Sequence, residues 1–174
     1  MGAFSAFLAA LFTEMYGFPF TIYILTALLG QNYPVLDPFH HEHGHLLEVF
    51  FGDNNLVSFL VHPGSDLLIL FSLVIIAISW KKIHGAQGEL VKDGLYKYIR
   101  HPQYTGFFLI IIAFLIQWPT IITLLMAPIL FIVYNNLAKS EEKIMIEKFG
   151  SEYEDYIENT NRFIPSLGRL TDLN

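Results

Sequence analysis

The stretch His101–Ala138, HPQYTGFFLIIIAFLIQWPTIITLLMAPILFIVYNNLA, contains no Asp, Glu, Lys or Arg. It is too long for one membrane span, which needs about 20 apolar residues as a helix. Trp118-Pro119 divides it, because proline lacks a backbone donor and disfavours helical conformation in the residue before it. We therefore predict a hairpin of two membrane-spanning helices, and the rest of the chain is interpreted around it.

The composition of the 174 residues agrees with a membrane protein. Apolar residues make up 53% and charged residues 15%, against about 25% charged in soluble globular proteins. This excludes an ordinary soluble domain, a disordered chain and a coiled coil. The absence of cysteine excludes disulfides, a thiolate nucleophile and a cysteine-based zinc site. We expect no nucleic-acid partner, and the oligomeric state stays open.

Two further apolar stretches lie before the hairpin. The first runs from about Ala3 to Leu29, with Glu14 inside it and a kink expected at Pro19. The second, Leu67–Trp80, is short and gains length if the amines of the following lysines reach the interface. We predict an all-α, polytopic membrane protein with about four transmembrane helices. It forms one domain over residues 1–174, with N-terminal spans and an external loop in 1–80 and a core in 81–165.

The basic residues predict the topology. All Lys and Arg lie at or after Lys81, and they follow the second and fourth spans. Because cytoplasmic loops are enriched in Lys and Arg, both termini and the segment 81–100 are expected in the cytoplasm. The N-terminus lacks the basic start of a secretory signal, so residues 1–174 are treated as the mature chain.

An amphipathic cytoplasmic helix is predicted over Ala138–Phe149, ended by Gly150. At 100° per residue, Glu141 projects from the middle of its apolar face and Glu142 lies near the edge. A carboxylate on an apolar face needs a partner, so Glu141 is a candidate for ligand binding. The alternative is a solvated tail whose acids bind nothing.

The loop before the third span has the residues of an anion clamp. Arg100 offers a planar fork, His101 a second donor, and Pro102 fits the first turn of a helix whose N-terminus favours negative charge. Glycines that let a backbone approach a ligand and tyrosines that can wall an aromatic ring surround it: Gly94, Gly106, Tyr96, Tyr98 and Tyr104. The alternative is a basic-aromatic loop that only anchors at lipid headgroups.

The motifs carry a family resemblance. The pattern Leu-Val-x-x-Gly-x-Tyr-x-x-x-Arg-His-Pro-x-Tyr-x-Gly over Leu90–Gly106 is followed by Glu141-Glu142 and by Phe-Gly-x-x-Tyr-x-x-Tyr over Phe149–Tyr156. Over roughly residues 80–165 this resembles the isoprenylcysteine carboxyl methyltransferase family, and phospholipid N-methyltransferases share a similar pattern. The resemblance implies a helical membrane enzyme that uses S-adenosylmethionine in a pocket at the cytoplasmic surface.

The resemblance and the clamp chemistry together give the expected site. Arg100 and Glu141 are the expected catalytic residues. The residues expected around the cofactor are Leu90, Val91, Gly94, Tyr96, Arg100, His101, Pro102, Gln103, Tyr104, Gly106, Glu141 and Glu142. Methyl transfer is an in-line displacement that needs no metal, so positioning and exclusion of water would supply most of the acceleration.

The methyl acceptor stays open among lipid amines, small thiols and carboxylates. In the prenylcysteine enzymes an Arg precedes the paired acids by four residues, whereas this chain has Leu137. Glu14 is an intramembrane acid and hence a candidate substrate-binding residue, or a carboxyl satisfied inside the bundle. The cluster His40–His45 lacks a helical His-x-x-x-His spacing, and no metal site is predicted.

Two other functions compete with a methyltransferase. Sterol reductases have a similar Arg-His-Pro-x-Tyr loop and bind NADPH, but they lack the paired acids found at Glu141-Glu142. A transporter or scaffold would use the loop only to touch lipid headgroups. Binding of S-adenosylmethionine or of NADPH discriminates between these functions.

Overall fold

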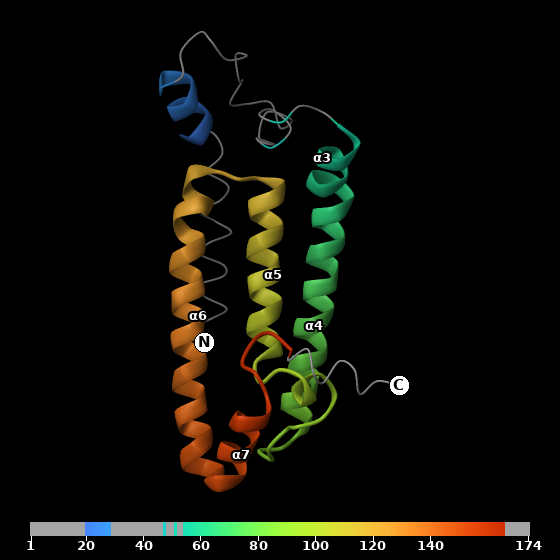
Figure 1. Ribbon diagram of the computed structural model, residues 1–174, viewed down its shortest axis with the longest axis vertical. Helices are drawn as coiled ribbons and strands as arrows, with labels where there is room; N and C mark the ends of the chain where they lie inside the picture. The colour runs from blue at the N-terminus through green and yellow to red at the C-terminus, as the bar shows by residue number, and fades with distance from the viewer. Residues whose placement is uncertain (1–19, 29–46, 48–50, 52–53, 166–174) are drawn as a thin grey trace. The chain divides into compact units, whose positions relative to one another are not determined.

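The computed structural model describes residues 20–28, 47, 51 and 54–165 (Figure 1). This part of the chain is helical and contains no strand, which confirms the all-α prediction for it. Besides a helix over residues 20–28, the elements are α3 (Asn55–Phe59), a π-helical turn (Leu60–Gly64), α4 (Ser65–Gly85), a 3-10 turn (Gly94–Lys97), α5 (Pro102–Gln117), α6 (Ile121–Phe149) and α7 (Ser151–Asn159).

The helical hairpin forms where it was predicted. Helix α5 ends at Gln117 and α6 begins at Ile121, on either side of Trp118-Pro119. The start of α6 is capped reciprocally: the Thr120 hydroxyl accepts a 3.1 Å bond from the backbone N–H of Thr123, and Thr123 Oγ1 accepts a 2.9 Å bond from that of Thr120. These bonds satisfy backbone donors that a helix N-terminus leaves free.

Two helical stretches are long and apolar enough to cross a membrane, Asn55–Gly85 and Ile121–Phe149, and Pro102–Gln117 is apolar but shorter. The predicted second span, Leu67–Trp80, lies inside α4, so this helix is longer than its uncharged core. Most of the predicted first span, with Glu14 and Pro19, lies outside the described residues, as does the cluster His40–His45.

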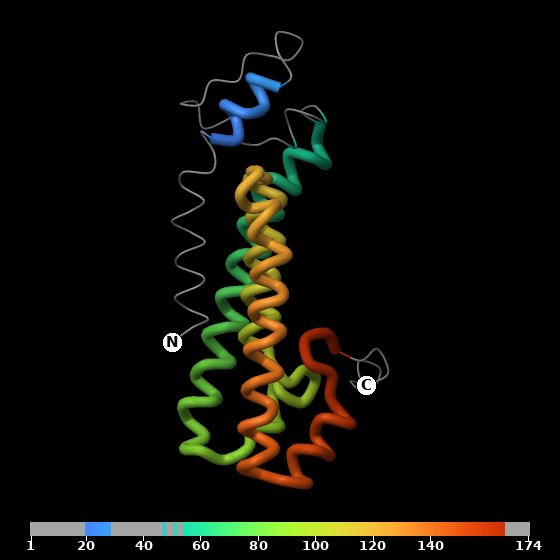
Figure 2. The backbone as a smooth tube through the Cα atoms, turned by 90° about the vertical axis from the view of Figure 1, so that its left-hand side faces the viewer, coloured from blue at the N-terminus to red at the C-terminus, as the bar shows by residue number. Residues whose placement is uncertain are grey.

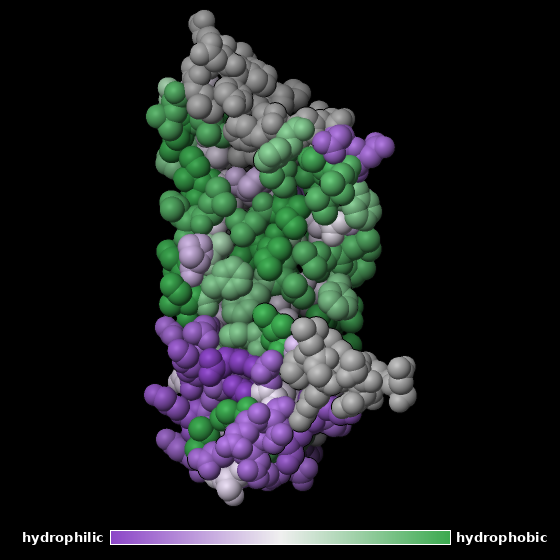
Figure 3. Space-filling model, viewed as in Figure 1, coloured by the Kyte–Doolittle hydropathy of each residue, from purple (hydrophilic) through white to green (hydrophobic). Residues whose placement is uncertain are grey.

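The surfaces of these helices suit a lipid environment. Only 22% of the most apolar window of each long stretch is buried, which is unlike the core helix of a soluble protein. Large apolar side chains are therefore exposed, among them Phe71 on α4 and Ile132 on α6. In Figure 3 the surface along the upper part of α6 is hydrophobic, whereas the surface around the C-terminal end of α6 and α7 is mostly hydrophilic.

The chain forms two compact units. The first comprises Met1–Ile69 and Ile110–Val133, and the second comprises Leu70–Leu109 and Tyr134–Asn174. In the first unit, Gln117 Nε2 donates a 3.1 Å bond to Asp66 Oδ1. The second unit holds every residue of the predicted loop and of the paired acids, so the candidate site lies within one unit.

The predicted amphipathic helix over Ala138–Phe149 is not a separate element. It is the C-terminal end of the continuous helix α6. Gly150 stops α6 as expected, with a positive φ of 57° that glycine adopts without strain. Helix α7 follows, with Tyr153 and Tyr156 buried on one face.

The segment after α7 returns to the loop before α5 (Figure 2). Asn161 pairs with Ile99 in an isolated parallel bridge. The backbone N–H groups of Arg100 and His101 donate to the carbonyl oxygens of Asn161 and Arg162, at 2.9 and 3.0 Å. These bonds fix the backbone at the two residues from which the predicted clamp projects.

Candidate active site

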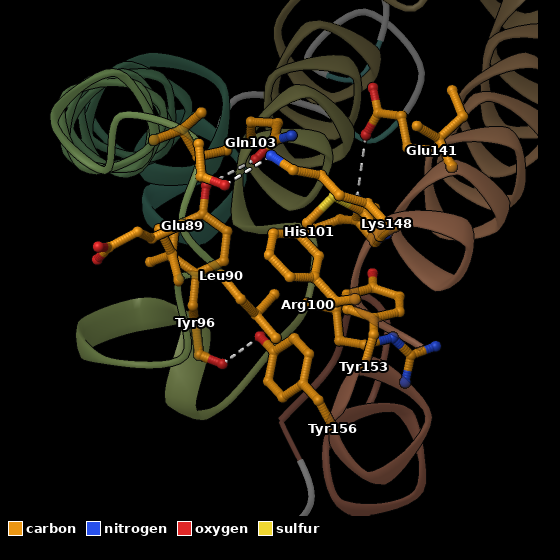
Figure 4. A pocket seen from close by; sticks show the side chains of 16 residues that line it. Glu89, Leu90, Tyr96, Arg100, His101, Gln103, Glu141, Lys148, Tyr153 and Tyr156 are labelled. Atoms are coloured by element: carbon orange, nitrogen blue, oxygen red, sulfur yellow. Dashed lines mark hydrogen bonds and ion pairs between the residues drawn. The ribbon is translucent and has the colours of Figure 1, made fainter. Parts of the chain in front are cut away.

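The second unit contains a cavity of about 320 Å³, within the size range of small-molecule sites. The loop after α4 forms one wall, and α6 with α7 forms the other (Figure 4). It is lined by Ile83, Gly88, Glu89, Leu90, Val91, Tyr96, Arg100, His101, Gln103, Glu141, Ile144, Met145, Lys148, Phe149, Tyr153 and Tyr156.

The structure brings seven of the predicted site residues together around this cavity: Leu90, Val91, Tyr96, Arg100, His101, Gln103 and Glu141. Five others lie outside its wall: Gly94, Pro102, Tyr104, Gly106 and Glu142. Gly106 instead permits close packing of α5 on α4, because a Cβ there would lie 2.6 Å from Ile76 Cγ1.

Tyr96 is held at the cavity wall by hydrogen bonds at both ends. Its hydroxyl donates a 3.0 Å bond to Gln103 Oε1, and its carbonyl oxygen accepts a 2.5 Å bond from Tyr156 Oη. Burial raises the pKa of the Tyr96 phenol, so it stays neutral at physiological pH. Since the Gln103 carbonyl already accepts this bond, its amide NH2 is the end that can donate to a ligand.

Glu142 is the buried carboxylate of the pair, although helical periodicity placed Glu141 in the middle of the apolar face and Glu142 near its edge. Glu142 is 6% exposed, whereas the side chain of Glu141 is 46% exposed. Glu142 Oε1 lies 2.9 Å from Arg100 Nε, and its Oε2 lies 2.6 Å from Arg162 Nη2. The apolar pattern of α6 could not predict this burial, because the two arginines that pair with Glu142 come from the loop and from the C-terminal segment.

The guanidinium of Arg100 binds within the protein. Its Nε and Nη2 reach Glu142, and its Nη1 donates to the carbonyl oxygens of Ile157 and Thr160. The predicted fork for an anion therefore exists, but in the structure the anion is Glu142. Arg100 thus links the loop, α6 and the end of α7, and its charge is compensated by a buried carboxylate.

Of the two adjacent acids, Glu141 is the one that lines the cavity. It accepts a 2.6 Å hydrogen bond from Tyr104 Oη, and its Oε2 lies 3.4 Å from His101 Nδ1, the contact drawn in Figure 4. A carboxylate has about four acceptor positions, so these contacts leave capacity for a ligand. The hydroxyl of Tyr104, itself outside the wall, orients Glu141.

His101 lies between the two carboxylates. Its Nε2 is 3.2 Å from Glu142 Oε1 and its Nδ1 is 3.4 Å from Glu141 Oε2. Burial lowers the pKa of His101, but the hydrogen bonds to Glu141 and Glu142 outweigh burial and raise it overall. Only the doubly protonated imidazolium donates from both nitrogens, so this geometry favours the cation.

Other residues in or beside the candidate site were not predicted from the sequence. Lys148 donates a 2.6 Å bond to the carbonyl oxygen of Gly88, and so connects α6 to the loop across the cavity (Figure 4). Arg162 pairs with Glu142, although it belongs to none of the motifs found in the sequence. Tyr153 and Tyr156 belong to the second motif but had been assigned no place in the site.

The part of the chain that contains the predicted loop and the paired acids is similar to known proteins. Residues 68–147 match the model of the isoprenylcysteine carboxyl methyltransferase (ICMT) family. This segment is ICMT-like. The match confirms the resemblance for Leu90–Gly106 and Glu141-Glu142, whereas Phe149–Tyr156 lies beyond the matched residues. It also agrees with a methyltransferase, because enzymes of this family use S-adenosylmethionine as methyl donor.

A relative supports the match. The protein-S-isoprenylcysteine O-methyltransferase of Schizosaccharomyces pombe is 34% identical over 79 residues, which cover 45% of this chain. The aligned residues cover 34% of the relative's own length. The shared part is therefore about a third of that enzyme.

Proposed function

We propose that this protein is a membrane-embedded methyltransferase that takes the methyl group from S-adenosylmethionine in the cavity of the second unit. The observation that carries the proposal is the position of Glu141 and His101. They come from different elements of an ICMT-like segment and meet at the wall of one cavity with Tyr96 and Gln103. A charged pair with aromatic neighbours suits a ligand that carries both charges and a ring.

The residues present fit the chemistry of S-adenosylmethionine. Glu141 would accept hydrogen bonds from the amine or the ribose hydroxyls, and the Gln103 amide would donate to an oxygen or a ring nitrogen. His101 and Lys148 are the cations available for the carboxylate. The rings of Tyr96, Tyr153 and Phe149 provide apolar faces for an adenine.

The cofactor would supply an activated methyl group on a sulfonium, and the chain would supply position and a dry environment. Leu90, Val91 and Met145 make part of the wall apolar, which favours expulsion of water around the bound cofactor. The hydrogen bonds of Tyr96 and Glu141 hold the polar side chains before a ligand arrives. Such preorganisation is the main source of acceleration expected for an in-line transfer without a metal.

The second substrate of the transfer is the methyl acceptor. The relative from Schizosaccharomyces pombe is named for a prenylated cysteine, and we propose a lipophilic or small acceptor for this chain. Its reactive group is a carboxylate, a thiol or an amine. Leu137 lies one helical turn before Glu141 on α6, so this chain has no cation at that position for the carboxylate of an acceptor.

We also propose four membrane spans with both termini and residues 81–100 in the cytoplasm. The two long stretches and the shorter helix α5 would supply three of these spans, and the apolar run Ala3–Leu29 would supply the fourth. The cavity would then lie at the cytoplasmic end, close to the bases of the loop.

Calorimetric titration of the purified protein tests the function. Saturable heat with S-adenosylmethionine and none with NADPH is expected. Heat with NADPH alone would identify a reductase-like site, and heat with neither would leave a protein without a cofactor. Incubation with S-adenosylmethionine labelled in its methyl group, in the presence of prenylcysteines, lipid amines or small thiols, then identifies the acceptor.

A further inference from the structure

The pairing of Glu142 with Arg100 is one-sided. Arg100 Nε and Nη2 lie 2.9 and 2.8 Å from the same oxygen, Glu142 Oε1. A guanidinium and a carboxylate commonly form two parallel bonds, one to each oxygen. The second oxygen of Glu142 is therefore held in another direction.

Arg162 holds that second oxygen. Its Nη2 donates a 2.6 Å bond to Glu142 Oε2, and its Nε donates a 3.0 Å bond to Oε1. Its Nη1 donates a 3.2 Å bond to Asn135 Oδ1 on α6, so the guanidinium is fixed at three points. The Arg162 side chain is 28% exposed and is absent from the cavity wall.

The consequence reaches the cavity through His101. With Oε2 of Glu142 bound to Arg162, Oε1 lies 3.2 Å from His101 Nε2. The other nitrogen of the same ring then faces Glu141, which lines the cavity. A carboxylate that closed symmetrically onto Arg100 would turn Oε1 away from His101.

We propose that Arg162 is a positioning residue, which keeps Glu142 from closing onto Arg100 and thereby fixes His101 beside Glu141 at the cavity wall. The link to catalysis rests on the proposed function, but the orientation of His101 does not. Arg162 acts from the C-terminal segment, outside the motifs of the loop and of α6.

A simple tether is the competing explanation, because Arg162 also ties the C-terminal segment to α6. Thr105 provides a matched control. Its Oγ1 donates a 2.8 Å bond to the carbonyl oxygen of Phe163 and lies 3.3 Å from the backbone carbonyl oxygen of His101, so it ties the same segment without a bond to Glu142 or to the His101 ring. Thr105→Val and Arg162→Ala both loosen the segment, but only the second frees Glu142.

Nuclear magnetic resonance titration of His101 in histidine-labelled protein without cofactor tests the positioning role. The His101→Gln variant identifies the resonance. The groups facing or flanking this ring are Glu141, Glu142, Arg100, Arg162 and Tyr104. In Arg162→Ala the pKa of His101 should fall, because Glu142 leaves Nε2. A purely electrostatic role predicts the opposite sign, since removal of a cation favours the imidazolium.

The other variants complete this test. Thr105→Val should leave the His101 pKa as in the wild type, and Arg162→Lys, which keeps the charge but not the fork, should lie between wild type and alanine. Arg162→Gln serves in place of the alanine variant if that variant does not fold. An unchanged or raised His101 pKa in the folded Arg162 variant would overturn the proposal.

Titration with S-adenosylmethionine gives the functional readout. Arg162→Ala should weaken binding about fivefold or more, roughly 1 kcal/mol, and Thr105→Val less than about twofold. Equal weakening by both variants would make Arg162 a tether and overturn the positioning role. No binding by the wild type would instead refute the proposed function, while the His101 titration still decides the orientation.

Discussion

Tyr156 on α7 donates a 2.5 Å hydrogen bond to the backbone carbonyl oxygen of Tyr96, sixty positions earlier in the chain. Both tyrosines are buried and both line the cavity. The bond joins α7 to the 3-10 turn over Gly94–Lys97, an element too short to be stable by itself. The geometry of the cavity wall at Tyr96 therefore depends on α7.

Tyr156→Phe should lower the free energy of unfolding by about 1–3 kcal/mol, because it leaves the buried carbonyl of Tyr96 without its donor. A thermal melt measures this loss. Tyr153→Phe is the matched control. Its ring packs 5.7 Å from that of Tyr156, centroid to centroid, and its replacement keeps the bond to Tyr96. Equal losses in both variants would show that the hydrogen bond to Tyr96 adds no more stability than the hydroxyl of Tyr153 does.

The two adjacent acids should respond differently to conversion to the amide. Glu142→Gln breaks a buried network with Arg100 and Arg162 and should cost about 3 kcal/mol of stability. Glu141→Gln should cost less stability than Glu142→Gln, because the Glu141 side chain is 46% exposed, but should weaken S-adenosylmethionine binding more than about tenfold, as expected for a lost charged acceptor. Thermal melts of both variants measure the loss of stability, and calorimetric titration measures the affinity for S-adenosylmethionine. Wild-type affinity in Glu141→Gln would remove Glu141 from the cofactor site.

Stability should depend on pH through His101. Its pKa is raised in the folded protein, since its hydrogen bonds to Glu141 and Glu142 outweigh burial. The stabilisation is thus complete below the unfolded pKa of about 6.5 and is lost as pH rises through the folded pKa. The difference in melting temperature between wild type and His101→Gln should shrink over this range. A difference that grows with pH would mean that the buried ring is neutral.

Gly106→Ala should disrupt the packing of α5 on α4. The new Cβ would lie 2.6 Å from Ile76 Cγ1 and 3.1 Å from the Ser72 carbonyl oxygen, and overpacking of this kind costs about 1–3 kcal/mol. Adding Ile76→Ala removes the closer clash and should restore part of the loss. Gly85→Ala, where nothing lies within 4 Å of the new Cβ, is the neutral control for these melts.

The helical hairpin was predictable because its cause is local. The charge-free run His101–Ala138 predicts two membrane-spanning helices, and Trp118-Pro119 within it predicts where they separate. Neither prediction needs the rest of the chain. The loop residues Tyr96, His101 and Gln103 were predictable for a different reason, since their spacing carries the family resemblance. Their position at one cavity wall agrees with that prediction.

The burial of Glu142 was not predictable from helical periodicity. Glu141 and Glu142 lie 100° apart on α6, and the side that meets the loop decides which of them is buried. Arg100 and Arg162 determine that side, because both form ion pairs with Glu142 and neither belongs to α6. Backbone hydrogen bonds from Arg100 and His101 to Asn161 and Arg162 hold the two segments together. An amphipathic pattern predicts only which apolar residues are buried. It misses Glu142, because ion pairs and not apolar contacts account for the burial of this side chain.

The topology can be tested with single cysteines, because the native chain has none. The stretch Asn55–Gly85 has 31 residues, or about 46 Å as a helix, enough to cross the roughly 30 Å hydrocarbon core. Asn55→Cys and Lys92→Cys should therefore lie on opposite sides. The positive-inside rule puts Lys92 in the cytoplasm, so a membrane-impermeant maleimide should label Asn55→Cys on intact cells and Lys92→Cys only after permeabilisation.

Lys92→Cys loses an exposed ion pair with Glu152, typically worth under about 1 kcal/mol, so the fold should persist. Labelling of position 92 from outside would reverse the topology, and labelling of both positions from outside would show that this helix does not cross the membrane.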